Sequence, residues 1–149
     1  MKKIKYLVLV LSLVLLTGCS KKMTCTSTSD QSKSGYKLES KYEITTNNNN
    51  VTKVEIEETI TSSDKKKLEK FEKQLDEQYS YNKKKYGGYT YKVTNSNGKV
   101  TSKVTIDYKK FDMKQFIKDN AAMKTYTKDD KLTLDGAKKL YESTGATCK

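Results

Sequence analysis

Charged and aromatic side chains gather most densely at residues 79–89. The group comprises Lys83, Lys84 and Lys85, with Tyr81 and Tyr86 beside them. Ammonium groups attract phosphates, and tyrosine rings present flat apolar faces on which sugars can stack. The pattern predicts a loop that binds an anionic polymer. The alternative, which the composition favours, is an ordinary solvated loop, because this chain uses lysine for all of its 30 basic residues.

Missing residue types argue against common enzyme mechanisms. The chain of 149 residues contains no histidine, and its basic residues include no arginine. Without histidine there is no Ser-His or Cys-His nucleophilic pair and no zinc site of the HExxH kind. Without arginine there is no bidentate clamp for phosphate, carboxylate or guanine edges. We therefore expect a protein that is not an enzyme, and we predict no cofactor.

The N-terminal residues have the pattern of an export signal. A lysine-rich start precedes an apolar run at residues 6–16, which is too short to span a bilayer comfortably as a helix. The run ends in Leu-Thr-Gly-Cys at Cys19, which resembles the bacterial lipobox. This resemblance implies that residues 1–18 are a lipoprotein signal peptide and that the Cys19 thiol carries lipid. The lipid chains would then hold the protein at the extracytoplasmic face of the cell membrane.

The segment after the lipobox predicts a spacer before the folded part. Residues 19–35 contain almost no apolar residue, and we expect a flexible tether there. A single domain at residues 36–149 follows, because the length allows one ordinary domain. Cys25 lies in the tether, and Cys148 lies next to the C-terminus. Outside the cytoplasm such a pair favours a disulfide bond, with two free thiols as the alternative.

Three aspartates near the C-terminus could hold a metal ion. Asp129, Asp130 and Asp135 offer the carboxylate oxygens that Ca²⁺ prefers. Their spacing lacks the pattern of the known Ca²⁺-binding loop, and Asp130 and Asp135 suit the start of helical turns. We therefore predict no metal site.

Alternating apolar and polar residues predict two β-hairpins. The first joins residues 36–44 to residues 53–60 through four asparagines at 47–50. Its apolar positions carry even numbers on both strands, so opposed residues require an odd number of turn residues, three or five.

The second predicted hairpin joins residues 89–94 to residues 100–108 through an Asn-Gly turn. This dipeptide is a strong signal for a two-residue turn. Such a turn pairs Tyr91 with Val104. Each inward pair of the hairpin near its open end is then apolar, so turn type and register agree.

Apolar stripes at helical spacing predict three helices, at residues 64–79, 112–120 and 133–144. Gly145 lies just beyond the last helix, where a glycine commonly stops one. The predicted fold class is α+β. It is a four-stranded, mainly antiparallel sheet made from two β-hairpins, with helices packed on one face in the order ββα-ββα-α.

The lipobox, the polar spacer and this order of elements together resemble the YehR-like bacterial lipoproteins, which carry a domain of unknown function. The segments that carry the resemblance are Tyr42-Glu43-Ile44, Val54-Glu55-Ile56-Glu57, Val104-Thr105-Ile106-Asp107-Tyr108 and Asp135-Gly136-Ala137-Lys138-Lys139-Leu140. It covers residues 36–144. The resemblance implies a small α+β lipoprotein of the cell envelope and supplies no assigned activity.

These inferences lead to an expected set of partners. The membrane is expected through the lipid on Cys19, and an anionic envelope polymer or a partner protein is expected at the domain. Nucleic acid is not expected, because an exported domain without arginine is poorly suited to it. The working function is a non-enzymatic binding protein of the envelope. The alternative is a small hydrolase or transferase that acts on envelope material.

Overall fold

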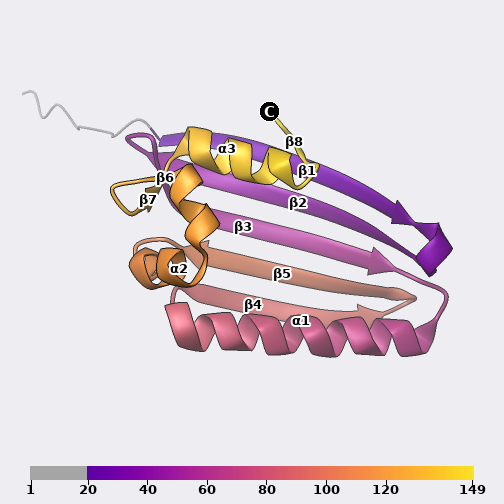
Figure 1. The fold of residues 1–149 in the computed structure, drawn as a ribbon. Helices are drawn as coiled ribbons and strands as arrows, with labels where there is room; N and C mark the ends of the chain where they lie inside the picture. Colours follow the sequence, from indigo (N-terminus) through magenta and orange to yellow (C-terminus); the bar gives the residue numbers. More distant parts are fainter. Residues whose placement is uncertain (1–19) are drawn as a thin grey trace, which may run out of the picture.

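A six-stranded antiparallel sheet forms the centre of the computed structural model, which describes residues 20–149 (Figure 1). The spatial order is β4-β5-β3-β2-β1-β8. The strands are β1 (Ser20–Gln31), β2 (Tyr36–Asn47), β3 (Asn50–Thr61), β4 (Tyr89–Ser96), β5 (Lys99–Asp107) and β8 (Thr147–Cys148).

The predicted α+β class and antiparallel sheet are confirmed. The prediction of four strands is wrong, because β1 and β8 were not foreseen. The predicted signal peptide at 1–18 and the predicted lipidation of Cys19 fall outside the described residues.

Strand β1 occupies most of the segment predicted as a flexible tether. It pairs with β2 along its whole length, from Ser20 opposite Asn47 to Gln31 opposite Tyr36. Its inward positions include Met23, which is 8% exposed, and Cys25, which is fully buried. The tether prediction is therefore wrong for this strand. Two buried side chains at a spacing of two, with a neighbouring strand to supply backbone hydrogen bonds, outweigh the polar composition.

The hairpin of β4 and β5 has the predicted register. Tyr91 lies opposite Val104, and the turn residues Asn97 and Gly98 both have positive φ angles, of 52° and 74°. These angles match a two-residue hairpin turn, in which both central residues adopt the left-handed region.

The hairpin of β2 and β3 has the predicted pairing of even-numbered residues, but the predicted length of its turn is wrong. Its turn has two residues between Asn47 and Asn50, not three or five, and the register shifts by a bulge between Thr45 and Thr46. Beyond the bulge Ile44 lies opposite Val54, so even-numbered residues face each other as expected. The extra residue of the bulge shifts the register by one position, as a turn with an odd number of residues would have done.

The helices lie against one face of the sheet, as predicted. They are α1 (Lys65–Tyr86), α2 (Met113–Asp119) and α3 (Leu134–Ser143), with a 3-10 helix η2 (Ala121–Tyr126) after α2 and a small hairpin of β6 (Thr127–Lys128) and β7 (Lys131–Leu132) before α3. Helix α1 packs against β4 and β5, and α3 crosses β1, β2 and β3 (Figure 1). No helix among residues 20–149 is both long and apolar enough to cross a membrane.

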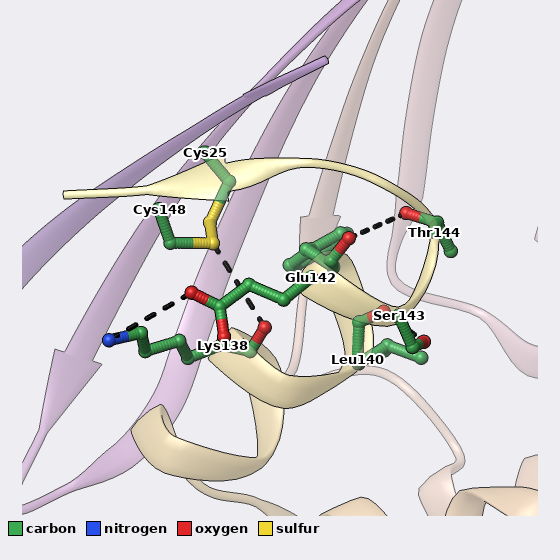
Figure 2. Close-up of a disulfide and its surroundings, with 8 residues drawn as sticks. Cys25, Lys138, Leu140, Glu142, Ser143, Thr144 and Cys148 are labelled. Carbon is green, nitrogen blue, oxygen red and sulfur yellow. Dashed lines mark hydrogen bonds and ion pairs between the residues drawn. A yellow bond between two sulfur atoms is a disulfide. The ribbon is translucent and has the colours of Figure 1, made fainter.

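A disulfide bond joins Cys25 to Cys148 and fixes the C-terminus against β1 (Figure 2). The predicted pairing is therefore present in the structure. Backbone hydrogen bonds between Thr24 and Lys149 run in both directions, with N···O distances of 3.0 and 2.9 Å. Beside the disulfide, residues 147–148 pair with β1 as the sixth strand, β8, although they carry almost no strand signal of their own.

Candidate functional site

Helix α1 runs through the region predicted as a basic loop. Its apolar stripe continues past Leu75 and Tyr79 to Tyr86, which lies two helical turns beyond Tyr79. It ends only at the Gly87-Gly88 pair, where both φ angles are positive. The loop prediction for residues 79–89 is therefore wrong. The continued spacing was the signal that could have revealed the helix.

The helical conformation separates the three predicted lysines. Consecutive residues on an α-helix point about 100° apart. Lys83, Lys84 and Lys85 are all exposed, but they fan out around the last turns of α1. Three ammonium groups that point in different directions do not form a single clamp. The proposed grip of Lys83, Lys84 and Lys85 on an anionic polymer stays a prediction.

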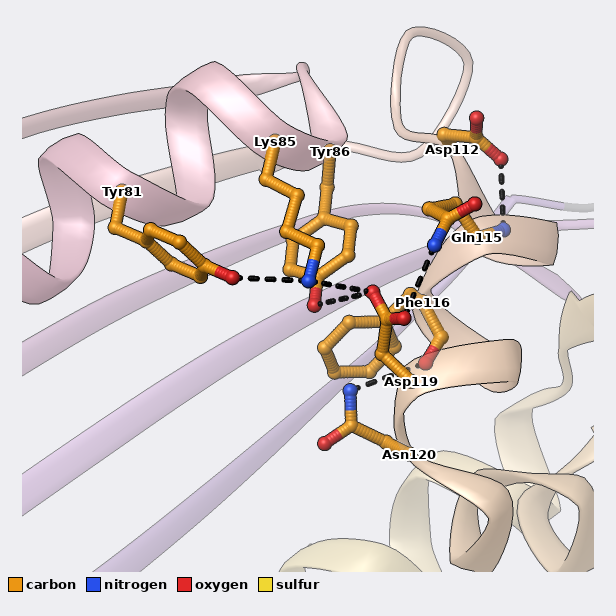
Figure 3. A network of polar contacts seen from close by, with 8 residues as sticks. All are labelled: Tyr81, Lys85, Tyr86, Asp112, Gln115, Phe116, Asp119 and Asn120. Carbon is orange, nitrogen blue, oxygen red and sulfur yellow. Dashed lines mark hydrogen bonds and ion pairs between the residues drawn. The ribbon is translucent and has the colours of Figure 1, made fainter.

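Lys85 is held by a network that links α1 to α2 (Figure 3). Its ammonium group donates to the Tyr81 hydroxyl at 2.9 Å and pairs with the Asp119 carboxylate, also at 2.9 Å. The Tyr86 hydroxyl donates to the same carboxylate at 3.0 Å. The hydrogen bonds to Tyr81 and Asp119 raise the pKa of Lys85, and the hydrogen bond from Lys85 lowers the pKa of Asp119. The charge of Lys85 is therefore engaged within the protein.

The two predicted tyrosines have different environments. Tyr86 is only 5% exposed, and its ring packs edge-on against Phe116 with centroids 5.0 Å apart. It is a core residue and offers no face for stacking. Tyr81 is 56% exposed, the most exposed large hydrophobic side chain among residues 20–149. The Lys85 ammonium lies 5.3 Å from its ring centroid and holds the ring on the helix surface.

A groove of about 710 Å³ lies beside Tyr81, between α1 and α2. Its lining residues are Gln74, Glu77, Gln78, Tyr81, Asn82, Tyr86, Tyr89, Phe116 and Asn120. The four amide side chains each offer both hydrogen-bond donors and acceptors, and no lysine lines the groove. An exposed ring beside several amides suits a sugar, which has an apolar ring face and a rim of hydroxyl groups. Sequence reasoning singled out the tyrosines and missed the amides.

A second polar feature, also missed, crosses the inner face of the sheet. Ser40, Glu58 and Ser102 lie side by side on β2, β3 and β5. The Glu58 carboxylate accepts a hydrogen bond from the Tyr79 hydroxyl at 2.6 Å and one from Ser102 at 3.3 Å. Burial, reinforced by the charge of Glu58, raises the pKa of Tyr79. Within residues 20–149, no lysine forms an ion pair with Glu58.

The three aspartates considered for Ca²⁺ lie on separate structural features. Asp129 and Asp130 form the turn between β6 and β7, and both have positive φ angles. Asp135 is in the first turn of α3 and pairs with Lys139 at 2.8 Å. Among residues 20–149, no three side chains of the metal-binding types are grouped to hold an ion.

The arrangement of sheet and helices defines a YehR-like α+β fold. The NMR structure of Escherichia coli YehR is similar, with a TM-score of 0.59 and 16% sequence identity, over 89% of this chain and 93% of that chain. The NMR structure of a protein from Streptococcus pneumoniae TIGR4 is also similar, with a TM-score of 0.55 and 16% identity, over 89% of this chain and 87% of that one. At this identity the likeness concerns the fold alone. No family model and no curated protein sequence matches the chain.

Proposed function

We propose that the protein is a lipoprotein of the bacterial envelope, anchored by lipid on Cys19, whose domain binds an envelope glycan in the groove beside Tyr81. The observation that carries the binding role is the combination of an exposed ring and four amides around one groove. The anchor is supported by the charged start, the short apolar run and the Leu-Thr-Gly-Cys motif. The protein would bind and position the glycan without chemically changing it.

The lining favours the hydroxyl groups of a glycan over its phosphates. Lys85 lies over the Tyr81 ring, and its charge is already paired with Asp119. Amide groups bind hydroxyls without net charge, so such binding depends only weakly on salt. An anionic polymer gripped by exposed lysines would instead be released as the ionic strength rises.

The decisive experiment measures binding of the full lipidated chain, in detergent micelles, to soluble peptidoglycan fragments and to wall teichoic acid. We expect Tyr81→Ala to weaken binding about tenfold, equivalent to ~1.4 kcal/mol, because the stacking surface is lost. The matched variant Tyr81→Phe keeps the ring and should retain most of the affinity. Raising the salt concentration should change the affinity little.

Two outcomes would contradict the proposed binding mode. If Tyr81→Ala binds as tightly as the parent chain, the groove is not the site. If Lys84→Gln and high salt abolish binding while Tyr81→Ala does not, the lysines bind an anionic polymer as the sequence first suggested. Release of shorter fragments during the incubation would favour the hydrolase alternative.

The mass of the mature N-terminal peptide tests the anchor directly, because lipidation adds the mass of the acyl chains to Cys19.

A further inference from the structure

The start of β1 lies very close to the proposed anchor. Ser20 is already paired with Asn47 in the sheet, and it directly follows Cys19 in the chain. Consecutive Cα atoms are about 3.8 Å apart, so lipid on Cys19 would leave no spacer between the membrane and the sheet. The same end of the sheet contains the turn between β2 and β3, the connection from β5 to α2, and the β6–β7 hairpin (Figure 1). We call this surface the anchor end.

The anchor end is rich in exposed lysines. They are Lys21, Lys22, Lys109, Lys110, Lys128 and Lys131. Of these six, only Lys110 forms an ion pair within residues 20–149, with Asp107 at 3.9 Å. Lys128 and Lys131 lie directly opposite each other in the β6–β7 hairpin. Asp129 and Asp130 form the turn between these two lysines, so the positive excess of this end comes mainly from Lys21, Lys22 and Lys109.

Two hollows at this end provide places for anionic groups. One, of about 330 Å³, is bordered by Lys109, Lys131 and the asparagines of the β2–β3 turn, together with Asp130. The other, of about 540 Å³, is bordered by Lys109 and Lys110 and by Asp107. Ammonium and amide groups both donate hydrogen bonds to phosphate oxygens. Lys109 borders both hollows and is therefore central to the surface.

We infer that the anchor end is a docking surface for anionic phospholipid headgroups, which fixes the domain in one orientation on the membrane. The inference rests on the lipid anchor proposed above. The sheet then stands with the β2–β3 turn and the β6–β7 hairpin against the headgroups, and the opposite end, with the Asn97-Gly98 turn, points away. Attraction between lysines and an anionic leaflet decays within a Debye length, so only lysines at this end take part.

The test uses the full lipidated chain in vesicles of phosphatidylcholine alone or of equal parts phosphatidylcholine and phosphatidylglycerol. Acylation of each lysine by an amine reagent is followed by mass spectrometry. We expect Lys109 and Lys131 to react about fivefold more slowly on the anionic vesicles than on phosphatidylcholine alone. This factor corresponds to the attraction of about 1 kcal/mol between one lysine and an anionic surface. The protection should disappear at about 1 M salt, where the Debye length falls to about 3 Å. Lys65 and Lys66, at the opposite end, should react equally on both vesicles.

Matched variants separate docking from anchoring. Lys128, in the β6–β7 hairpin, should share the protection of Lys131. The double variant Lys109→Gln/Lys131→Gln should abolish this protection of Lys128, whereas Lys65→Gln/Lys66→Gln should preserve it. A lipidated chain whose Lys109 and Lys131 react equally fast on both vesicles overturns the docking surface and leaves the anchor intact. A mature chain without lipid on Cys19 overturns the anchor and with it this orientation. The two failures are therefore distinguishable.

Discussion

Glu58 places a carboxylate on the inner face of the sheet, between Ser40 and Ser102, and its neighbours account for how it is tolerated. The inner side chains on either side of it along β3 are Ile56 and Ile60, which belong to different clusters of the core. The charge is stabilised by the hydroxyls of Tyr79 and Ser102 rather than by a lysine. A half-buried charge that is stabilised only by hydrogen bonds lowers the stability of the fold. Such arrangements are often kept for function.

A double-mutant cycle measures what this arrangement contributes. Glu58→Leu removes the main acceptor and leaves the Tyr79 hydroxyl with only the Ser102 hydroxyl, at 3.4 Å, so we expect a loss of about 1–3 kcal/mol in the free energy of unfolding. Adding Tyr79→Phe removes this weakly bonded hydroxyl and should restore most of the loss. Urea unfolding of the parent, both single variants and the double variant gives the coupling. Additive effects would show that the Tyr79–Glu58 hydrogen bond carries no coupling energy. Glu58→Gln keeps an acceptor and serves as the mild control.

Asp119 gives the domain a specific pH dependence. Hydrogen bonds from Lys85, Gln115 and Tyr86 lower its pKa in the folded state. A depressed carboxylate pKa stabilises the fold above the unfolded value of about 3.9, and this contribution is lost as the pH falls through the folded pKa. We expect Asp119→Asn to be less stable than the parent at pH 7, with the difference shrinking in acid. Urea unfolding from neutral pH to about pH 3 checks this.

A control at an exposed position isolates the network. Asp76 lies on α1 and forms no ion pair within residues 20–149. Asp76→Asn should therefore leave the pH dependence close to that of the parent. If Asp119→Asn and Asp76→Asn follow the same curve, the Lys85–Asp119 network does not contribute to stability.

The residue-level predictions from sequence met with mixed results, for a physical reason. The cysteine pair could be deduced because two thiols in a chain with the pattern of an export signal have few options other than a disulfide. The environments of Tyr81 and Tyr86 could not be distinguished, because that depends on which side of α1 faces α2. Lys85 could not be recognised as paired, because Asp119 lies 34 residues further along the chain.

At the scale of elements, local signals were reliable and long-range ones were not. The register of the β4–β5 hairpin agrees with the prediction, because an Asn-Gly turn fixes both conformation and register. The strands are Tyr89–Ser96 and Lys99–Asp107, against the predicted 89–94 and 100–108. Strand β1 was missed because Ser and Thr dominate it, and its inward Met23 and Cys25 gain their burial from β2 and α3 rather than from sequence neighbours. The last turns of α1 were missed because most of their residues are polar, although their few apolar residues continue the helical spacing.

Gly136 shows how tightly one element packs against the next. A Cβ atom at this position in α3 would lie 1.8 Å from the Tyr126 carbonyl oxygen of η2. Gly136→Ala therefore forces α3 and η2 apart, and we expect a loss of about 1–3 kcal/mol or more. Lys138→Ala, at an exposed position of the same helix, should cost little. Thermal unfolding followed by circular dichroism compares the two, and equal midpoints would contradict the close packing.

On the scale of the whole molecule, β1 connects several distant parts of the chain. It lies between β2 and β8, and α3 packs across it. The sequence could not predict this arrangement, because the order of strands in a sheet depends on contacts between segments far apart in the chain. The order β5-β3 illustrates the same point, since these neighbours are separated in sequence by α1 and β4.

The disulfide should therefore matter to the entire fold rather than to the C-terminus alone. It links residues 123 positions apart, and cross-linking so long a loop restricts the unfolded chain strongly. We expect the double variant Cys25→Ser/Cys148→Ser to lose about 2–5 kcal/mol in the free energy of unfolding. Urea unfolding of the variant should match that of the reduced parent chain, because both lack the cross-link. If the variant is as stable as the oxidised parent, the pairing of β1 with β2 is sufficient to keep β1 in the sheet, and the disulfide adds no stability. A variant much less stable than the reduced parent would instead show that the serines disturb the packing around Cys25, which is fully buried.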